Sequence, residues 1–453
     1  MLQPIQAVIL AGAGGKHLFP LNSAGMPKVL LPVANRPLLT FPLRTLEEAG
    51  IIDVLVVCEG EAAASAVKSW FSQQHKSGIS IEVVKVAEDL PSVSALRQVM
   101  DRIKTENCVV LSGDVVTEVP LRAQLLQHQL RGATVTALFG HKKTSPAADT
   151  QPGKPPRNVD YVGLADGNRL AYYTHSVDAL KEVALPQAAL TRFPSLGLTT
   201  KLVDMQVYVF QTAALREVLQ EHPELEKLED HLLPYLARRQ APVGSSNSSR
   251  SKSIGVGERG DVDITPTRSG SGGGTNDEAV SINNDSNSNT TEWMCTAYVA
   301  PEGSYCQRAN TLQGYADVNR ETVTPELAQK IIRETPHARG ENFLASGVAL
   351  GTKATIGGAC MVGSESVLGD KCSVKRSVIG RGCFLGSGVK IINSVLMDGV
   401  QVGDTCHIQN SIVCKGCVVQ TGAQVKDCQI GPMFVVKAGS DHKAEVLAIE
   451  KKN

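Results

Sequence analysis

The sequence predicts an α/β domain built on a mostly parallel sheet, followed by a solenoid with three short strands per turn. Two observations carry this prediction. Short aliphatic runs alternate with helical patterns in the first half of the chain. After about residue 341, an aliphatic residue returns every six positions. We expect four parts: the α/β domain (1–242), a disordered linker (243–292), a connector (293–340) and the solenoid domain (341–453).

Strands and helices alternate along the first part. We predict strands at Ala7–Ala11, Asp53–Cys58, Ile81–Val86, Cys108–Ser112 and Ala133–Phe139. We predict helices at Pro37–Ala49, Ala62–Phe71 and Val93–Lys104. Most of the strands are runs of valine, isoleucine and leucine, which is typical of a parallel sheet covered on both faces. The polar, proline-rich segment Thr144–Arg157 is expected to be a surface loop.

The linker and the connector differ sharply in composition. The linker is rich in serine, glycine and asparagine, as in SSNSSRSKS and RSGSGGGTNDE. Such a segment buries too little apolar surface to offset the entropy lost on ordering, so we expect it to be disordered. The connector, Trp293–His337, is expected to be structured and to contain one short helix, Pro325–Glu334.

The repeat of the last part keeps a fixed register. Its aliphatic positions are Leu350, Ile356, Val362, Leu368, Val374, Ile379, Leu385, Ile391, Leu396, Val402, Ile408, Val413, Val419, Val425 and Ile430. After the first run the spacing is six, six and five, so one turn takes 17 residues. Stacked turns of this kind bury their aliphatic residues against neighbouring turns. The pattern resembles the hexapeptide repeat of left-handed parallel β-helices, and we predict that fold here.

Cysteines recur in one slot of this repeat. Cys414 and Cys417 form a C-x-x-C pair, which out of context suggests a metal or redox site. However, a cysteine stands two residues before an aliphatic position at Cys360, Cys372, Cys383, Cys406, Cys417 and Cys428. Serine and alanine occupy the same slot in other turns, so the slot selects a small side chain. We therefore expect packing there rather than zinc or a disulfide, and we predict no metal site.

Charge and the N-terminal sequence bear on the class of protein. The chain has 453 residues, with 45 basic and 45 acidic side chains, so no overall field favours nucleic acid or an anionic membrane. Met1–Gln6 carries no basic residue, and the apolar run after it is too short for a signal peptide or a membrane span. We expect a cytosolic (cytoplasmic) protein whose 11 cysteines are reduced thiols.

A glycine-rich loop follows the first predicted strand. It includes Gly12, Gly14 and Gly15, and glycine after a parallel strand lets backbone amides approach a phosphate closely. The string continues through KHLFPL to PKVLLPV, and LSGD occurs later. This combination resembles the signature of the sugar-1-phosphate nucleotidyltransferases, whose domain is a Rossmann-like α/β fold. The resemblance implies that Asp114 stands where that family holds magnesium.

Three departures from that signature predict a degenerate pocket. His17 takes the place of an arginine that neutralises phosphate charge, and a mostly neutral imidazole is a poor substitute. The segment Pro91-Ser92-Val93 replaces small residues that pack against the base, and Asp204 replaces an asparagine. Lys28 and Asp114 remain, either as the rest of a site or as a solvated lysine and a turn-capping carboxylate. We expect no catalytic residues, no cofactor and a vestigial nucleotide pocket at Gly12, Gly14, Gly15, His17, Lys28, Asp114 and Asp204.

A narrower resemblance carries the expectation about function. The strand LVDMQVY, the segment DHLLPYLARRQ and the stretch SVKRSVIG are similar to those of the gamma subunits of eukaryotic translation initiation factor 2B. This resemblance covers about 5–240 and 293–449. It implies a heterodecamer with the epsilon, alpha, beta and delta subunits, acting on translation initiation factor 2. Since the chain leaves no room for the helical exchange domain of epsilon, we expect a scaffold that supports exchange of GDP for GTP.

Two alternatives stay open at the level of sequence. One is an active sugar-1-phosphate nucleotidyltransferase, such as a mannose-1-phosphate guanylyltransferase or a glucose-1-phosphate adenylyltransferase. The other is a regulatory subunit that senses a nucleotide sugar without turning it over. Neither membrane contact nor direct nucleic-acid binding is expected.

Overall fold

The computed structural model describes residues 4–12, 15–23, 25–74, 78–143, 159–176, 180, 182–240, 251–255, 261–264, 293–333 and 342–449. The chain divides into two compact units. The first contains 1–123, 205–207 and 300–453, and the second contains 124–204 and 208–299. The predicted 1–242 domain is therefore shared between the units, and the connector helices belong with the solenoid.

A four-stranded parallel sheet forms the α/β part of the first unit. Its strands, in the order in which they pair, are β6 (Asn107–Ser112), β1 (Gln6–Leu10), β4 (Asp53–Glu59) and β5 (Ser80–Val86). The helices are α1 (Thr40–Ala49), α2 (Gly60–Gln74) and α3 (Ser92–Val99). These elements confirm the predicted strands and helices to within a few residues. The exception is the end of α3, where a 3-10 turn, Met100–Arg102, takes over before Lys104.

The second unit holds a separate run of strands, most of them antiparallel. In order of pairing they are β15 (Asp261–Ile264), β12 (Leu196–Thr199), β9 (Val159–Ala165), β10 (Arg169–Ser176), β16 (Cys295–Val299), β8 (Val135–His141) and β13 (Leu202–Gln211). Strand β16 pairs parallel with β8 and antiparallel with β10. The start of the predicted connector is thus an internal strand of this unit.

The structure differs from a wholly irregular linker at two places. Strand β14 (Ser251–Gly255) pairs antiparallel with β11 (Glu182–Pro186), and β15 pairs antiparallel with β12. Both segments, SKSIG and DVDI, combine polar and aliphatic residues over a few positions, as short edge strands do. Apart from these strands, the linker lies outside the described residues, so its disorder stays a prediction. The predicted loop at Thr144–Arg157 also lies outside them.

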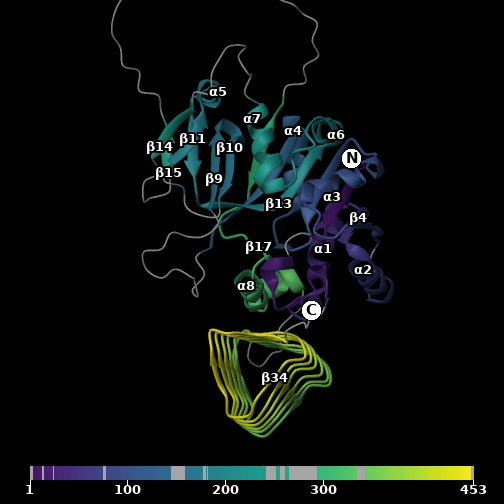
Figure 1. Ribbon diagram of the computed structural model, residues 1–453, viewed down its shortest axis with the longest axis vertical. Helices are drawn as coiled ribbons and strands as arrows, with labels where there is room; N and C mark the ends of the chain where they lie inside the picture. Colours follow the sequence, from purple (N-terminus) through teal and green to yellow (C-terminus); the bar gives the residue numbers. More distant parts are fainter. Residues whose placement is uncertain are drawn as a thin grey trace, which may run out of the picture. The chain divides into compact units, whose positions relative to one another are not determined.

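The last part of the chain is the predicted β-helix, and it has three flat sides when seen end-on (Figure 1). We call these the first, second and third faces. The first face consists of β18 (Phe343–Leu344), β21 (Met361–Val362), β24 (Val378–Ile379), β27 (Val395–Leu396), β30 (Ile412–Val413), β33 (Gln429–Ile430) and β36 (Val446–Leu447). The second consists of β19 (Ala349–Leu350), β22 (Val367–Leu368), β25 (Phe384–Leu385), β28 (Gln401–Val402), β31 (Val418–Val419) and β34 (Val435–Val436). The third consists of β20 (Thr355–Ile356), β23 (Ser373–Lys375), β26 (Lys390–Ile392), β29 (His407–Gln409), β32 (Gln424–Lys426) and β35 (Asp441–Lys443).

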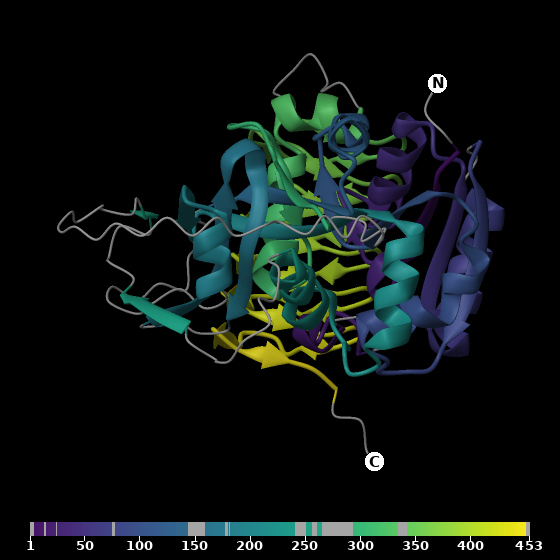
Figure 2. The ribbon, with the colours of Figure 1, turned by 90° about the horizontal axis from the view of Figure 1, so that it is seen from above.

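Each face is a parallel ladder in which a strand pairs with its counterpart one turn away (Figure 2). From Val362 to Ile430, the predicted aliphatic positions are buried inside the coil. The small slot works as predicted, because Ser377, Ser394 and Ser411 stack one per turn. The backbone N–H of each next slot residue donates to the hydroxyl of the previous serine at 3.1 Å. The β-helix prediction is confirmed.

The connector adds helices that sequence patterns had only partly indicated. The predicted helix at Pro325 is present as α9 (Pro325–Leu327), which runs into a π-helical turn, Ala328–Ile332. A longer helix, α8 (Leu312–Thr322), was not predicted. Residues such as Tyr315 and Val318 of α8 share one hydrophobic cluster with the outward side chains of the first face, including Val395. The first face is therefore apolar both inside the coil and on its outer surface, and α8 covers part of that outer surface.

Candidate functional site

The predicted phosphate loop leads away from the C-terminal end of β1. Gly12 is described and partly buried, Gly14 lies outside the described residues, and Gly15 begins a 3-10 turn, Gly15–Leu18. A Cβ atom at Gly12 would come within 2.6 Å of Oε1 of Glu59, so the Glu59 side chain occupies the space beside this glycine. The glycine accommodates a neighbouring side chain of the protein itself.

The cavity next to Gly12 is very small. It is lined by Gly12, Glu59, Ser92 and Ala95 together with four aliphatic residues, and its volume is about 10 Å³. That is roughly the space needed for one water molecule. Pro91 is the N-cap of α3, and Val93 in the first turn is fully buried. The substituted segment Pro91-Ser92-Val93 therefore closes the side against which, by the family resemblance, a base would pack.

Lys28 and Asp114 come together at the end of β6. Lys28 Nζ donates a hydrogen bond to Oδ2 of Asp114, and both side chains are buried. Gly113 permits this approach, because a Cβ atom there would lie 2.5 Å from Cγ1 of Val29. The two residues are thus neither a solvated lysine nor a turn-capping carboxylate, and form a buried ion pair.

A second cation, which sequence analysis did not identify, completes this cluster. Arg308 Nε donates to Oδ1 of Asp114 at 2.9 Å, and Arg308 Nη2 donates to Oδ2 at 3.2 Å. Arg308 ends β17 (Cys306–Arg308), which pairs antiparallel with β7 (Val115–Thr117), the strand directly after Asp114. A fork of two parallel donors to one carboxylate is the strongest arrangement available to an arginine.

The protonation of Asp114 follows from this surrounding. Burial by itself would raise the pKa of Asp114, but the charges and hydrogen bonds of Arg308 and Lys28 outweigh it. They hold the pKa of this carboxyl well below its usual range. Asp114 is therefore a fully ionised carboxylate whose two oxygens both accept from cationic donors.

This donor set does not fit a magnesium ion. Magnesium requires oxygen ligands at close range, and usually keeps several waters as well. Both oxygens of Asp114 are engaged by ammonium and guanidinium groups, whose charge repels a divalent cation. Within the described part of the chain, no group of three or more histidine, cysteine or acidic side chains is arranged to hold a metal ion.

The remaining predicted site residues are not among the groups that bind Asp114. His17 is exposed on the turn Gly15–Leu18. Asp204 is buried in the second unit on β13, where it accepts a hydrogen bond from the hydroxyl of Tyr208. The backbone N–H of Asp204 donates to Oδ2 of Asp160 at 2.7 Å. Asp160 also contacts Nδ1 of His175 at 2.6 Å. This hydrogen bond raises the pKa of His175 and outweighs the opposing effect of burial.

The segment DHLLPYLARRQ has a structural role within the second unit. It spans a π-helical turn, Leu228–Leu232, and α7 (Leu233–Arg239), and ends at the buried Gln240. The side-chain amide of Gln240 donates to the carbonyl of Leu170 on β10 at 2.7 Å, and its oxygen accepts from the N–H of Cys295 on β16 at 2.9 Å. One side chain thus joins α7 to two neighbouring strands.

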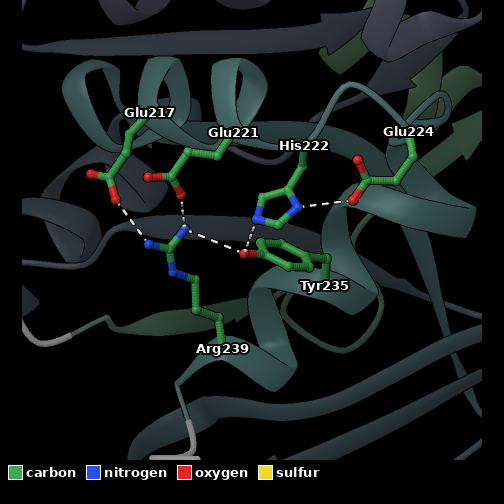
Figure 3. Close-up of polar contacts among 6 residues, drawn as sticks. All are labelled: Glu217, Glu221, His222, Glu224, Tyr235 and Arg239. Atoms are coloured by element: carbon green, nitrogen blue, oxygen red, sulfur yellow. Dashed lines mark hydrogen bonds and ion pairs between the residues drawn. The ribbon is translucent and has the colours of Figure 1, made fainter.

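The outer side of α7 carries a polar network with α6 (Thr212–Glu221), shown in Figure 3. Arg239 contacts Glu217 at 2.8 Å and Glu221 at 3.4 Å, and lies over the ring of Trp293, 4.1 Å from its centroid. The hydroxyl of Tyr235 contacts Nε2 of His222 at 2.7 Å. These contacts hold α7 against α6 and against Trp293.

The second face of the β-helix has an unusual outer surface. Its outward ladder is Ala349, Val367, Phe384, Gln401, Val418 and Val435, in register from one turn to the next. All are exposed except Val418, which is half-buried, and Phe384 is 51% exposed. The equivalent ladder of the third face is Thr355, Ser373, Lys390, His407, Gln424 and Asp441. The outer side of the second face is therefore apolar and exposed, whereas that of the third face is polar.

Comparison with known proteins gives two matches to family models. Residues 6–149 match the family described as nucleotidyl transferase, and residues 339–441 match the eIF2B subunit epsilon LbH domain. The eIF2B gamma subunit of Dictyostelium discoideum is 27% identical over 396 residues, which is 83% of this chain and 88% of that protein. The eIF2B gamma subunit of Schizosaccharomyces pombe is 28% identical over 378 residues, or 82% of this chain and 73% of that protein.

Over four fifths of its length, the chain is similar to eIF2B gamma subunits.

Similarity to sugar nucleotidyltransferases covers a smaller share of the chain. The mannose-1-phosphate guanylyltransferase of Mycobacterium tuberculosis is 33% identical over 134 residues, which is 29% of this chain and 36% of that protein. The two eIF2B gamma subunits named above, by contrast, match over four fifths of the chain. Among the described residues, no helix combines the length and apolar character needed to cross a bilayer.

Proposed function

We propose that this chain is a non-catalytic subunit of an eIF2B complex and supports GDP-to-GTP exchange on translation initiation factor 2 by binding its partner subunits. The observation that carries the proposal is the cluster at Asp114. Both oxygens of this carboxylate are bound by Lys28 and Arg308, and the cavity beside Gly12 has a volume of about 10 Å³. A carboxylate in this state does not offer itself as a metal ligand, which favours a function carried by the surfaces of the chain.

The second face of the β-helix is the surface that suits a partner best. The first face is apolar too, but α8 of this chain lies over it. The second face presents Val367, Phe384 and Val435 outward with 39%, 51% and 49% of their surface exposed. Contiguous exposed apolar residues of this kind mark protein interaction sites. Regular, flat strand ladders also present their side chains in straight rows, which a second β-helix can match.

The occupant we propose for this face is the β-helix of the epsilon subunit. The β-helix of this chain matches the family model of that domain, so the two domains have closely similar ladders. Like surfaces of similar spacing pack well against each other across a pseudo-twofold axis. The alpha, beta and delta subunits complete the expected heterodecamer, and translation initiation factor 2 is its substrate.

Co-purification followed by release of labelled GDP tests this proposal. The chain is expected to bind epsilon stably and to raise the rate at which epsilon releases GDP from initiation factor 2. Replacing Phe384 with Asp puts a charge in the centre of the apolar ladder, and we expect it to weaken binding at least about tenfold. Lys390→Asp is the matched control, because Lys390 occupies the equivalent outward position on the third face.

The outcomes separate the proposal into its two parts. If the wild-type chain neither binds epsilon nor changes the rate, the assignment as a supporting subunit is wrong. If the wild-type chain binds but Phe384→Asp binds equally well, the partner uses another surface. Circular dichroism and thermal melting of both variants establish that they are folded.

The transferase alternative rests on the match of the N-terminal region to sugar nucleotidyltransferases. It requires magnesium-dependent pyrophosphorolysis of GDP-mannose or ADP-glucose by the purified chain. We expect none, because the cations around Asp114 exclude the metal. Saturable nucleotide-sugar binding without turnover and without an epsilon partner would instead favour the sensing alternative.

A further inference from the structure

A cleft of about 600 Å³ lies within the first unit, between a tight hairpin and the first turns of the β-helix. The hairpin joins β2 (Pro32–Val33) to β3 (Arg36–Pro37), and its turn residues, Ala34 and Asn35, both have positive φ. From the β-helix side, the cleft is lined by strands β18 and β21 of the first face and by the corner that contains Arg381. This cleft is distinct from the small cavity beside Gly12.

The hairpin is fixed to its surroundings by specific hydrogen bonds. Asn35 Nδ2 donates to the carbonyl of Ile379 at 2.9 Å, and the backbone N–H of Ala34 donates to Oδ1 of Asn319 on α8 at 3.0 Å. The Arg381 guanidinium donates to the carbonyl of Asn35 at 3.3 Å. The hairpin and the β-helix therefore form one rigid wall, and the cleft is already formed before a ligand binds.

Three arginines line this cleft, namely Arg36, Arg333 and Arg381. None of the described residues that line it is acidic. Arg333 pairs with Glu48, which offsets its charge. Burial lowers the pKa of Arg44, and the charges of Arg36 and Arg333 lower it further, whereas those of Glu48 and Glu47 raise it.

The accessible apolar floor of the cleft is formed by Leu344, which is half-buried, and Ala345, which is exposed. The other lining residues include buried Phe343, Met361 and Val362 and polar Asn35 and Ser364. Small-molecule sites in proteins typically have volumes of about 300–1,000 Å³, with mostly apolar walls and a few polar groups that orient the ligand. Arginine forks are the protein's best match for phosphate oxygens, since they donate two parallel hydrogen bonds.

We propose that this cleft binds a small phosphorylated ligand, with its phosphates held by Arg36 and Arg381 and its remaining part against the apolar floor. The ligand class is a nucleotide or a sugar phosphate. A nucleotide would place its base on the floor, and a sugar phosphate would place its sugar ring there. The proposal is independent of partner binding, because every residue it uses belongs to one unit of this chain.

Isothermal titration calorimetry tests the proposal on the full chain, and again on its complex with epsilon. The probes are GDP, glucose 1-phosphate and inorganic pyrophosphate, with guanosine and hexaglutamate as probes that lack phosphate. We expect saturable 1:1 binding of at least one phosphorylated probe and none of guanosine. Raising the salt concentration from about 50 to 300 mM should weaken binding, because surface charges are screened over shorter distances.

Variants locate the binding in the cleft. Arg36→Ala with Arg381→Ala is expected to weaken binding by at least about tenfold, the effect of losing charge-assisted hydrogen bonds. Arg376→Ala is the matched control, since Arg376 is an exposed β-helix arginine that does not line the cleft. It should bind as wild type. Thermal melting confirms that all variants are folded.

Three results would overturn the proposal. One is the absence of saturable binding by every phosphorylated probe at millimolar concentration. Another is unchanged affinity in the Arg36→Ala/Arg381→Ala double variant, which would place the ligand elsewhere. The third is binding of hexaglutamate but of no phosphorylated probe, which would make the cleft a site for an acidic peptide. None of these results affects whether the chain binds epsilon.

Discussion

At the scale of single residues, one carboxylate distinguishes this chain from the enzymes it resembles. Asp114 stands at the end of β6, where the resemblance to the transferases predicts a metal ligand. Arg308 reaches it from a position 194 residues later in the chain and, together with Lys28, saturates both oxygens. The same carboxylate thereby changes from a ligand for an ion into a structural anchor for β17.

The stability of this anchor leads to a prediction at the same scale. Arg308→Ala leaves a buried carboxylate with one cation, and we expect it to lower the free energy of unfolding by about 3–5 kcal/mol at pH 7. Urea unfolding followed by circular dichroism measures this, with the exposed Arg376→Ala as control. An unchanged free energy of unfolding in Arg308→Ala would contradict the prediction.

The pH dependence of the anchor follows from the direction of the pKa shift. Because the folded pKa of Asp114 lies below its unfolded value of about 3.9, the contribution is complete above roughly pH 4. It decreases as the pH falls toward the lowered folded value. In Arg308→Ala the shift is smaller, so this variant should lose less stability than wild type between pH 5 and pH 3 when unfolding is measured across that range.

At the scale of elements, each coil of the β-helix obeys one rule: aliphatic residues point inward at the predicted positions and outward residues differ by face. The outward side of the first face is covered within this unit, that of the third face is polar, and that of the second is apolar and exposed. The two apolar faces have different consequences. One stabilises the chain itself and the other is available to a partner.

Neighbouring residues of strand β28 allow a direct test of the inward rule. Val402 is 1% exposed inside the coil, whereas Gln401 points outward from the same strand. Val402→Asp buries a carboxylate among aliphatic layers, and we expect a loss of several kcal/mol and a melting temperature lower by many degrees. Gln401→Asp should change stability by less than about 0.5 kcal/mol. Similar melting temperatures for the two variants would refute the inward placement of Val402.

At the scale of the whole molecule, thiol chemistry reports on both units at once. All eleven cysteines are buried and free. Burial raises the pKa of Cys58 to about 12, and that of Cys383 and Cys417 to about 11. Since the thiolate is the reactive form, these groups are protected both by poor access and by protonation.

Labelling with a thiol reagent at pH 8 measures this protection. We expect the folded chain to react with far less than one equivalent over minutes, and the chain in denaturant to react with all eleven. Cys414 and Cys417 are the sensitive pair, because a C-x-x-C redox site would react first. Fast labelling of either in the folded chain would revive the redox interpretation of that motif.

Features that arise from neighbouring residues in the sequence can be predicted from it, whereas features that arise from contacts between distant segments cannot. The β-helix register and the strands and helices of the first part arise from periodicity over a few residues, and they were predicted to within a few positions. Strand β16, helix α8 and the ion pair of Arg308 depend on contacts with segments far away along the chain. A lone arginine after a long polar stretch carries no local pattern, so Arg308 could not be assigned to Asp114 from sequence.

The insertion of β16 between β10 and β8 has a consequence for the order of folding during synthesis. The slot between these two strands stays open on the ribosome until Cys295–Val299 emerges. At 5–20 residues per second, the roughly 120 residues between β10 and β16 take about 6–24 s to make. Throughout that interval the edges of β8 and β10 are unpaired, so chaperone binding to nascent chains should end only when translation has passed this strand.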